Sequence, residues 1–161
     1  MIRALLLFCM LLLSACASHA PLPAQIPHLK LPIQLNAQRQ QGGQHQNWRV
    51  EVKKRDHGVR WSLTDTSGAV LAQQDLTNDG WTASAKTDAD FDAQELFSAT
   101  MFALTSEAEV RFDYPGVQLQ PHGRTLEDRW QVNYGSEGFI RLILPDDVTY
   151  LLSPVKGKAS R

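Results

Sequence analysis

The chain has 161 residues, of which 43% are hydrophobic and 20% charged, with 16 lysines and arginines against 17 aspartates and glutamates. This near-neutral balance, without a run of like charges, excludes the basic surface that nucleic-acid binding needs and a polybasic membrane patch. The length suits one domain with a sizeable core rather than two.

The N-terminal residues have the anatomy of a bacterial lipoprotein signal. Arg3 supplies a short positive region, and residues 4–13 form an apolar core. This core of about ten residues is shorter than the roughly 20 that a spanning helix needs. The run Leu13-Ser14-Ala15-Cys16 matches the cleavage and acylation box of bacterial lipoproteins. We expect residues 1–15 to be removed as a signal peptide and Cys16 to be acylated, with palmitate among the attached acyl chains. The alternative is an ordinary cleaved secretory signal in which Cys16 has no special role.

The residues around Cys16 also predict the compartment. Three acyl chains on a terminal cysteine hold a protein permanently, because burial contributes about 0.8 kcal/mol per methylene. Ala17 and Ser18 lack the aspartate that favours inner-membrane retention in enterobacterial lipoproteins, so the sequence resembles those sorted to the outer membrane. We expect a lipid anchor in the outer membrane, facing the periplasm. Cys9 leaves with the signal, so we expect no disulfide in the folded part.

Residues 16–28 form the predicted tether. Their composition shifts to Ala, Pro, Ser, His and Gln, and Pro21, Pro23 and Pro27 favour extended polyproline conformation. Residues 29–155 form the predicted β domain, and residues 156–161 a flexible tail. We expect the tether to let a monomeric domain stand off the membrane.

Alternation of apolar and polar residues from residue 29 onward predicts antiparallel strands. The first covers 29–35, where Pro32 demotes it to an edge or a bulged position, and a Gln/Gly-rich loop follows. Two strands around the turn at 56–58 form a predicted hairpin with one solvent-exposed face. The apolar residues on its other face are Trp48, Val50, Val52, Val59, Trp61 and Leu63. Further strands are expected over 69–76 and from Trp81 onward, which completes a meander.

A helix is expected over residues 92–105. Asp92 and Glu95 fit a capping pair at its first turn, and one apolar stripe contains Leu96, Phe97, Thr100, Met101 and Leu104. Short strands should follow over 108–113, 117–120, 129–134, 138–144 and 148–152. Together these elements predict a mainly β, α+β domain: a curved antiparallel sheet that forms a half-open barrel, with this helix on its concave face.

All four tryptophans lie on the apolar side of predicted strands. If they converge on one face, they line either a closed core or a hydrophobic cavity. Because one predicted helix must cover a sheet of about eight or more strands, we expect much of the concave face to lack cover from this chain. The predicted lining residues of this cavity are Trp48, Trp61, Leu63, Trp81, Phe97, Met101, Leu104, Trp130 and Val132.

The last predicted strands carry a family resemblance. The block Asp128-Arg129-Trp130-Gln131-Val132-Asn133-Tyr134-Gly135 is similar to the end of LolB, where a Trp-x-Val-x-Tyr-Gly strand precedes the final hairpin. With the lipoprotein box, the tether and the central helix, the chain resembles the LolA/LolB lipoprotein-carrier superfamily. More closely, residues 48–152 resemble the small LolB-like lipoproteins that accompany aryl polyene type lipid biosynthesis clusters, through segments 63–68, 70–75 and 94–104. The resemblance implies a half-open barrel that accommodates acyl chains or a lipid-like molecule.

The sequence also departs from LolB. It is shorter, it has a strand-like segment where LolB has an N-terminal helical region, and no segment matches the exposed-leucine loop by which LolB delivers lipoproteins. The resemblance therefore implies binding of an apolar ligand more directly than lipoprotein transfer. The expected partners are the outer membrane through the acyl anchor, an apolar small molecule or acyl chain, and a periplasmic carrier or exporter.

Sequence motifs for catalysis or metal binding are missing. There is no Gly-x-Ser-x-Gly elbow, and the five histidines have no partner at motif spacing. Asp88, Asp90 and Asp92 have the spacing that opens a calcium loop, but Ala93 and Ala99 stand where that loop needs glycine and glutamate. We predict a protein that is not an enzyme and needs no cofactor or metal. Two functions stay open: a lipoprotein that binds or helps transfer an acyl, glycolipid or lipoprotein ligand, and an accessory lipoprotein with a closed core that docks an envelope protein.

Overall fold

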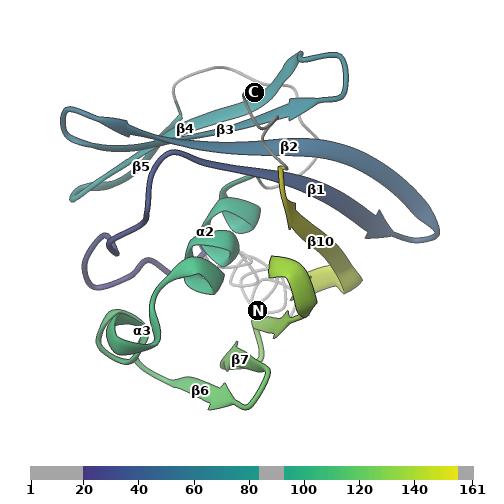
Figure 1. The fold of residues 1–161 in the computed structure, drawn as a ribbon. Coiled ribbons are helices and arrows are strands. Elements are labelled where there is room, and N and C mark those ends of the chain that lie inside the picture. The colour runs from purple at the N-terminus through teal and green to yellow at the C-terminus, as the bar shows by residue number, and fades with distance from the viewer. Residues whose placement is uncertain (1–19, 84–92, 156–161) are drawn as a thin grey trace, which may run out of the picture.

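One antiparallel sheet of ten strands makes up most of the fold. The computed structural model describes residues 20–83 and 93–155. The strands lie in the order β5-β4-β3-β2-β1-β10-β9-β8-β7-β6, so β5 and β6 are the edges and the sheet does not close (Figure 1). The predicted mainly β, α+β fold with an open, curved antiparallel sheet is confirmed.

The sheet consists of two five-stranded meanders that meet in its middle. The first contains β1 (Ile33–Gln41), β2 (Gln44–Arg55), β3 (Gly58–Asp65), β4 (Val70–Thr77) and β5 (Gly80–Ala83). The second contains β6 (Val117–Gln120), β7 (Gly123–Leu126), β8 (Trp130–Tyr134), β9 (Ile140–Leu144) and β10 (Val148–Pro154). β10 pairs with β1, with Ala37 opposite Leu152, and this pairing joins the two meanders.

Two helices connect the meanders, α2 (Ala93–Leu104) and α3 (Glu107–Asp113). α2 lies on the concave side of the sheet (Figure 1). Ten of its twelve residues are buried, which is more than the single apolar stripe that the sequence predicts, because the sheet curves around it. Within the described ranges, no helix is long and apolar enough to cross a membrane.

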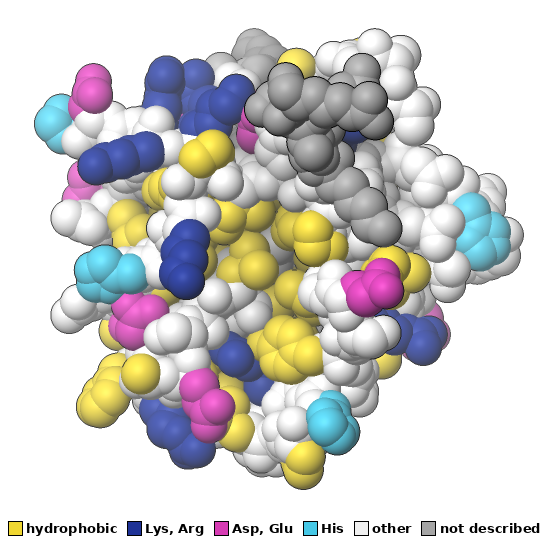
Figure 2. Space-filling model, viewed as in Figure 1, with side chains coloured by type: hydrophobic (Ala, Val, Ile, Leu, Met, Phe, Trp, Pro, Cys, Tyr) yellow, Lys and Arg dark blue, Asp and Glu magenta, His cyan; other side chains and the backbone are white. Residues whose placement is uncertain are grey.

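The core lies between α2 and the concave face of the sheet. Along β2 and β3, buried residues such as Val50 and Leu63 alternate with more exposed ones, as the pleat of a strand requires. Buried apolar residues from both meanders and from α2 belong to one cluster. Figure 2 shows hydrophobic side chains gathered in the centre of the face on which Figure 1 shows α2, with charged side chains mainly around them. The interior of the curved sheet is therefore apolar.

The strand predicted over 108–113 is wrong, because these residues form α3. Ser106 is the N-cap of this helix: its Oγ accepts a hydrogen bond from the Glu109 backbone N–H and donates one of 2.8 Å to Glu109 Oε2. The Ser-x-x-Glu spacing is that of a capping box, and it favours the start of a helix over the weak alternation that follows. The Ser-x-x-Glu spacing is visible in the sequence, but the strand predicted over 108–113 rested on alternation alone.

The first strand also differs from its prediction. β1 begins at Ile33, after Pro32, and it is an interior strand between β2 and β10 rather than an edge. The predicted Gln/Gly-rich loop is mostly strand, because β1 and β2 extend to Gln41 and Gln44 and leave only Gly42 and Gly43 between them. Polar residues fit here because ladder hydrogen bonds do not depend on side-chain polarity.

One tight turn explains how β2 and β3 lie against β4. Gly58 begins β3 with φ +143°, and a Cβ placed there would lie 2.0 Å from the carbonyl oxygen of Leu76. Only glycine tolerates both this backbone conformation and this approach. The turn predicted at 56–58 is therefore a fixed contact with β4.

Candidate functional site

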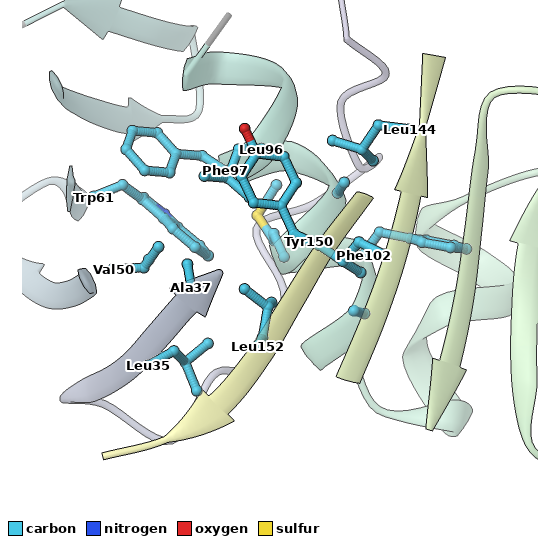
Figure 3. Packing of buried hydrophobic residues seen from close by; sticks show 14 of the residues in the cluster. Leu35, Ala37, Val50, Trp61, Leu96, Phe97, Phe102, Leu144, Tyr150 and Leu152 are labelled. Carbon is cyan, nitrogen blue, oxygen red and sulfur yellow. The ribbon is translucent and has the colours of Figure 1, made fainter. Parts of the chain in front are cut away.

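Three aromatic rings meet where α2 lies against the first meander. Trp61 from β3, Trp81 from β5 and Phe97 from α2 have ring centroids 5.6 to 6.1 Å apart. Trp61 and Phe97 are completely buried, whereas Trp81 is half-buried. Figure 3 shows Trp61 between Phe97 and Val50. We call Trp61, Trp81 and Phe97 the aromatic triangle; it unites three of the nine residues predicted to line a cavity.

Charged and polar side chains hold the first turn of α2 to the second meander. Arg129 donates two hydrogen bonds to the carboxylate of Glu95, Nε to Oε1 at 2.9 Å and Nη2 to Oε2 at 2.5 Å. Trp130 Nε1 donates a third, 2.5 Å long, to Oε1. Glu95 is only 8% exposed, so these bonds join groups that have largely left water. Bonds of this kind are among the stronger ones in proteins.

The last turn of α2 is held to the same meander. Arg124 on β7 donates through Nη1 to the carbonyls of Phe102 and Thr105, at 3.1 and 2.9 Å. Tyr134 on β8 donates its hydroxyl to the Ala103 carbonyl at 2.7 Å. Carbonyl groups at the C-terminal end of a helix have no N–H donor within the helix. They carry partial negative charge, so a cation such as the Arg124 guanidinium is favourable there. Burial raises the pKa of the Tyr134 hydroxyl, so it stays a neutral donor at physiological pH.

The attachment of α2 to the first meander has a different character. Within ranges 20–83 and 93–155, one hydrogen bond links α2 to strands β3 to β5, from Trp81 Nε1 to Ser98 Oγ at 3.1 Å. The other contacts there are those of the aromatic triangle and its apolar neighbours. α2 is therefore fixed by ionic and hydrogen-bonded contacts on one side and by apolar contacts on the other.

Three buried polar atoms in this region have no hydrogen-bond partner among the described residues. They are the indole Nε1 of Trp61, which is a donor, the hydroxyl of Thr100 on α2, and the side-chain oxygen Oε1 of Gln74, which stands opposite Trp61 on β4. Trp61 and Thr100 are completely buried. An unpaired buried polar group costs about 1–3 kcal/mol, and natural structures contain few of them. A ligand with an acceptor oxygen could pair with the Trp61 indole.

The other six predicted lining residues are not part of the aromatic triangle. Trp130 stacks against Phe102 with centroids 5.6 Å apart, and Trp48 against Tyr150 at 6.1 Å. Leu63, Met101 and Val132 are buried, and Leu104 is half-buried. The four tryptophans thus belong to the concave side as predicted, but they divide among three aromatic groups.

Sequence reasoning missed the residues that fix α2. Glu95 was expected only as a cap, and Arg124 lies in β7, a strand that the alternation did not predict. Phe102 and Tyr114 are buried in contact with each other, 4.9 Å apart, but lie outside the predicted stripe. Partners such as Glu95 and Arg129 are 34 residues apart in the sequence, so no local pattern connects them.

A second hollow lies on the opposite, outer face of the sheet. Its volume is about 670 Å³, and polar side chains dominate its lining: Asn36, Gln38, Asn47, Arg49, Thr64 and Ser153. Such a surface does not suit an acyl chain. Among the described residues, no group of three or more His, Cys, Asp or Glu side chains is placed to hold a metal ion.

The predicted attachment residue Cys16 and the predicted cap Asp92 lie outside the described residues. The candidate site therefore rests on the aromatic triangle and the uneven attachment of α2. In comparisons with known proteins, no protein-family model matches this chain, and no curated protein matches it either.

Proposed function

We propose that this protein is a lipoprotein, anchored in the outer membrane through Cys16, that binds the acyl part of a lipid, glycolipid or lipoprotein between α2 and strands β3 to β5. The protein makes and breaks no bond in this role. The anchor keeps it on the periplasmic side of the membrane, where it can exchange its ligand with a periplasmic carrier or exporter. The sequence around Cys16 supports the anchor, and the contacts of α2 support the ligand site.

The uneven attachment of α2 is the observation that carries the ligand site. Moving α2 away from β7 and β8 would break the Glu95–Arg129 pair and would strip Arg124 of its two carbonyls. Among the described residues, moving it away from β3 to β5 would break one hydrogen bond, from Trp81 to Ser98, and would separate apolar surfaces. An acyl chain that enters this second contact restores the lost burial, which is worth about 25 cal/mol per Å². The second contact is thus the one that a lipid can replace at small cost.

The unpaired indole of Trp61 indicates the chemistry of the ligand. A pure hydrocarbon would leave the Nε1 donor without a partner, as it is now. A carboxyl or ester oxygen at the end of an acyl chain would accept this hydrogen bond. We therefore favour acyl ligands over hydrocarbons or aromatic molecules without acceptor oxygens.

A closed-core docking lipoprotein is the second candidate function. The observation in its favour is that Trp61, Leu63, Phe97 and Met101 have no accessible surface, as in a fully packed core. In that function the domain is a rigid support, and an exposed face or a sheet edge binds an envelope protein. The two functions differ in whether α2 can separate from β3 to β5.

Native mass spectrometry of the full acylated protein, extracted in mild detergent, distinguishes the two functions. The apolar-ligand function predicts a bound species with the mass of a lipid or fatty acid. This species should be lost when the protein is exchanged into buffer that contains an excess of a ligand-free fatty-acid-binding protein. The ratio of bound to free protein should fall in the Phe97→Ser variant, which puts a hydroxyl into the aromatic triangle, and persist in Thr64→Ser on the outer face. A ligand-free spectrum, together with no saturable binding of added fatty acid, would leave the docking function.

A further inference from the structure

Phe112 is an aromatic residue that the fold leaves in water. It lies on α3 and is 80% exposed, whereas Phe97 and Phe102 on the neighbouring helix are completely buried. A single exposed apolar side chain needs no function to explain it. Phe112 differs from an ordinary surface residue because of the chain segment that lies beside it.

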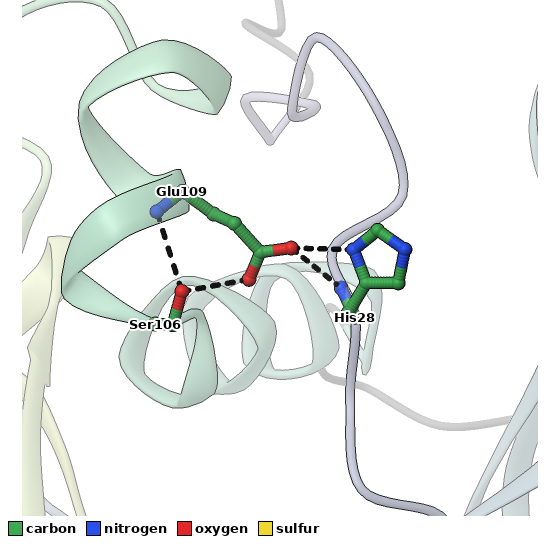
Figure 4. Close-up of polar contacts among 3 residues, drawn as sticks. All are labelled: His28, Ser106 and Glu109. Carbon is green, nitrogen blue, oxygen red and sulfur yellow. Dashed lines mark hydrogen bonds and ion pairs between the residues drawn. The ribbon is translucent and has the colours of Figure 1, made fainter.

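The N-terminal segment that follows Cys16 is bonded to α3. The backbone N–H of Ala24 donates to the carbonyl of Asp113, the residue after Phe112, at 2.8 Å. Four residues later, the backbone N–H of His28 donates to Glu109 Oε1 at 3.2 Å, and the His28 Nδ1 lies 2.6 Å from the same oxygen (Figure 4). Glu109 is in turn held by Ser106, the N-cap of α3. Residues 24 and 28 of the predicted tether are thus fixed to the helix that carries Phe112, so this part of the segment does not act as a free spacer that holds the domain off the membrane.

This attachment limits how far α3 can lie from the anchor. Ala24 is eight positions after Cys16 in the sequence, and a fully extended chain spans at most about 3.5 Å per residue. With Cys16 acylated, the Asp113 carbonyl therefore lies within about 30 Å of the bilayer surface. The turn between β3 and β4 lies across the molecule from α3 in Figure 1. The short connection therefore keeps α3 near the anchor.

We propose that Phe112 inserts into the bilayer to which the protein is anchored, so that α3 is the membrane-contact face of the domain. The proposal rests on the acyl anchor of the proposed function. Phe is among the side chains found on the membrane face of a helix that lies at the boundary of headgroups and acyl chains, where its ring leaves water. The exposed Arg111 beside Phe112 can reach a lipid phosphate, but Glu107 is exposed on the same helix, so net charge does not draw α3 to the membrane. The contact should therefore be apolar and insensitive to salt.

A fluorophore attached at residue 112 tests this proposal. The mature acylated chain has no free thiol, so Phe112→Cys in the full protein gives a single site for an environment-sensitive nitrobenzoxadiazole label. Val70→Cys at the start of β4 is the matched control, because Val70 is also an exposed apolar residue, 51% accessible. Both labelled proteins are placed in phosphatidylethanolamine/phosphatidylcholine vesicles, with and without nitroxide-labelled lipid.

The proposal predicts that the label at 112 emits at shorter wavelength in vesicles than in detergent-free buffer and loses at least half of its intensity to the nitroxide lipid. The label at 70 should be unaffected, and 0.5 M salt should change neither result. Equal, small quenching at both sites would overturn the membrane contact while leaving the anchor intact. Vesicle flotation of the same samples reports the anchor separately: protein that stays at the bottom of the gradient would overturn the anchor and this inference together.

Discussion

The guanidinium of Arg129, immediately before β8, donates hydrogen bonds to both carboxylate oxygens of Glu95 in the first turn of α2. The two residues are 34 positions apart in the sequence, and their side chains are only 20% and 11% exposed. Together with Arg124 at the other end of α2, it makes the second meander the fixed support of the helix. In the proposed ligand-binding function, the first meander is then the side on which the helix separates from the sheet.

Replacing Arg129 by Met should lower the free energy of unfolding by about 2 kcal/mol at neutral pH, because it leaves the Glu95 carboxylate largely buried with fewer partners. Urea denaturation followed by tryptophan fluorescence measures this loss. Arg60→Met is the matched control, since Arg60 makes an equally short two-bond pair with Asp75, but on the outer face of the sheet. It should cost much less. Equal losses in the two variants would contradict the clamping role of Arg129.

Asp113 gives a prediction about pH. Burial, and then the nearby Glu109, raise the pKa of the Asp113 carboxyl above its unfolded value. Both states are protonated below the unfolded pKa, so the carboxyl contributes nothing there. As the pH rises from the unfolded pKa to the raised folded pKa, the unfolded state ionises first and stability is lost. Asp113→Asn should therefore gain stability relative to the wild type as the pH rises from below the unfolded pKa of about 3.9 to neutrality.

Urea midpoints of both proteins across this range measure the difference. A constant difference at all pH values would show that Asp113 ionises as easily in the folded protein as in the unfolded chain. Asp147→Asn is a suitable control, because this exposed carboxyl lies at the turn before β10, far in sequence from α3.

Much of the sheet could be predicted from the sequence because alternation is a local property. Residues such as Val50 and Trp61 reveal their face through their immediate neighbours, and β6 was predicted with its observed limits. The capping box at Ser106 was also local and readable. By contrast, the contacts that fix α2 depend on Arg124 and Arg129, whose partners are distant in sequence. The local sequence around a buried, paired arginine does not differ from that around an exposed one, so such a residue cannot be recognised before the fold is known.

The candidate site was predictable only in part, for the same reason. The sequence placed Trp61, Trp81 and Phe97 on apolar faces, but it could not show that these three meet while Trp48 and Trp130 join other rings. Convergence depends on the curvature of the sheet, which no local pattern specifies.

The anchor is tested by changing Cys16 to Ser. Because a serine hydroxyl cannot form the thioether that carries the lipid, labelled palmitate should no longer be incorporated and the unprocessed precursor should accumulate. Gel fluorography after metabolic labelling measures both. Cys9→Ser is the control and should leave labelling unchanged, since Cys9 precedes the expected cleavage point. Persistent label in the Cys16→Ser protein would refute the attachment site.

The ligand chemistry is tested by Trp61→Phe, which keeps an aromatic ring but removes the Nε1 donor. A hydrogen bond is worth about 0.5–1.5 kcal/mol, so affinity for a fluorescent fatty acid should fall by about two- to tenfold, while affinity for an all-hydrocarbon probe should stay the same. Trp48→Phe, in the ring pair with Tyr150, controls for the lost volume. An equal loss for both probes would show that the Trp61 indole makes no hydrogen bond to the ligand.

Photocrosslinking tests the ligand site itself most directly. The full protein is incubated with a fatty acid that carries a diazirine near its carboxyl end, irradiated, and digested, and the labelled residues are identified by mass spectrometry with and without excess unlabelled fatty acid. Binding between α2 and β3 to β5 predicts saturable labels at or beside Trp61, Trp81 and Phe97. Labels that excess fatty acid does not displace, or that lie only on the outer face of the sheet, would contradict a ligand site under α2.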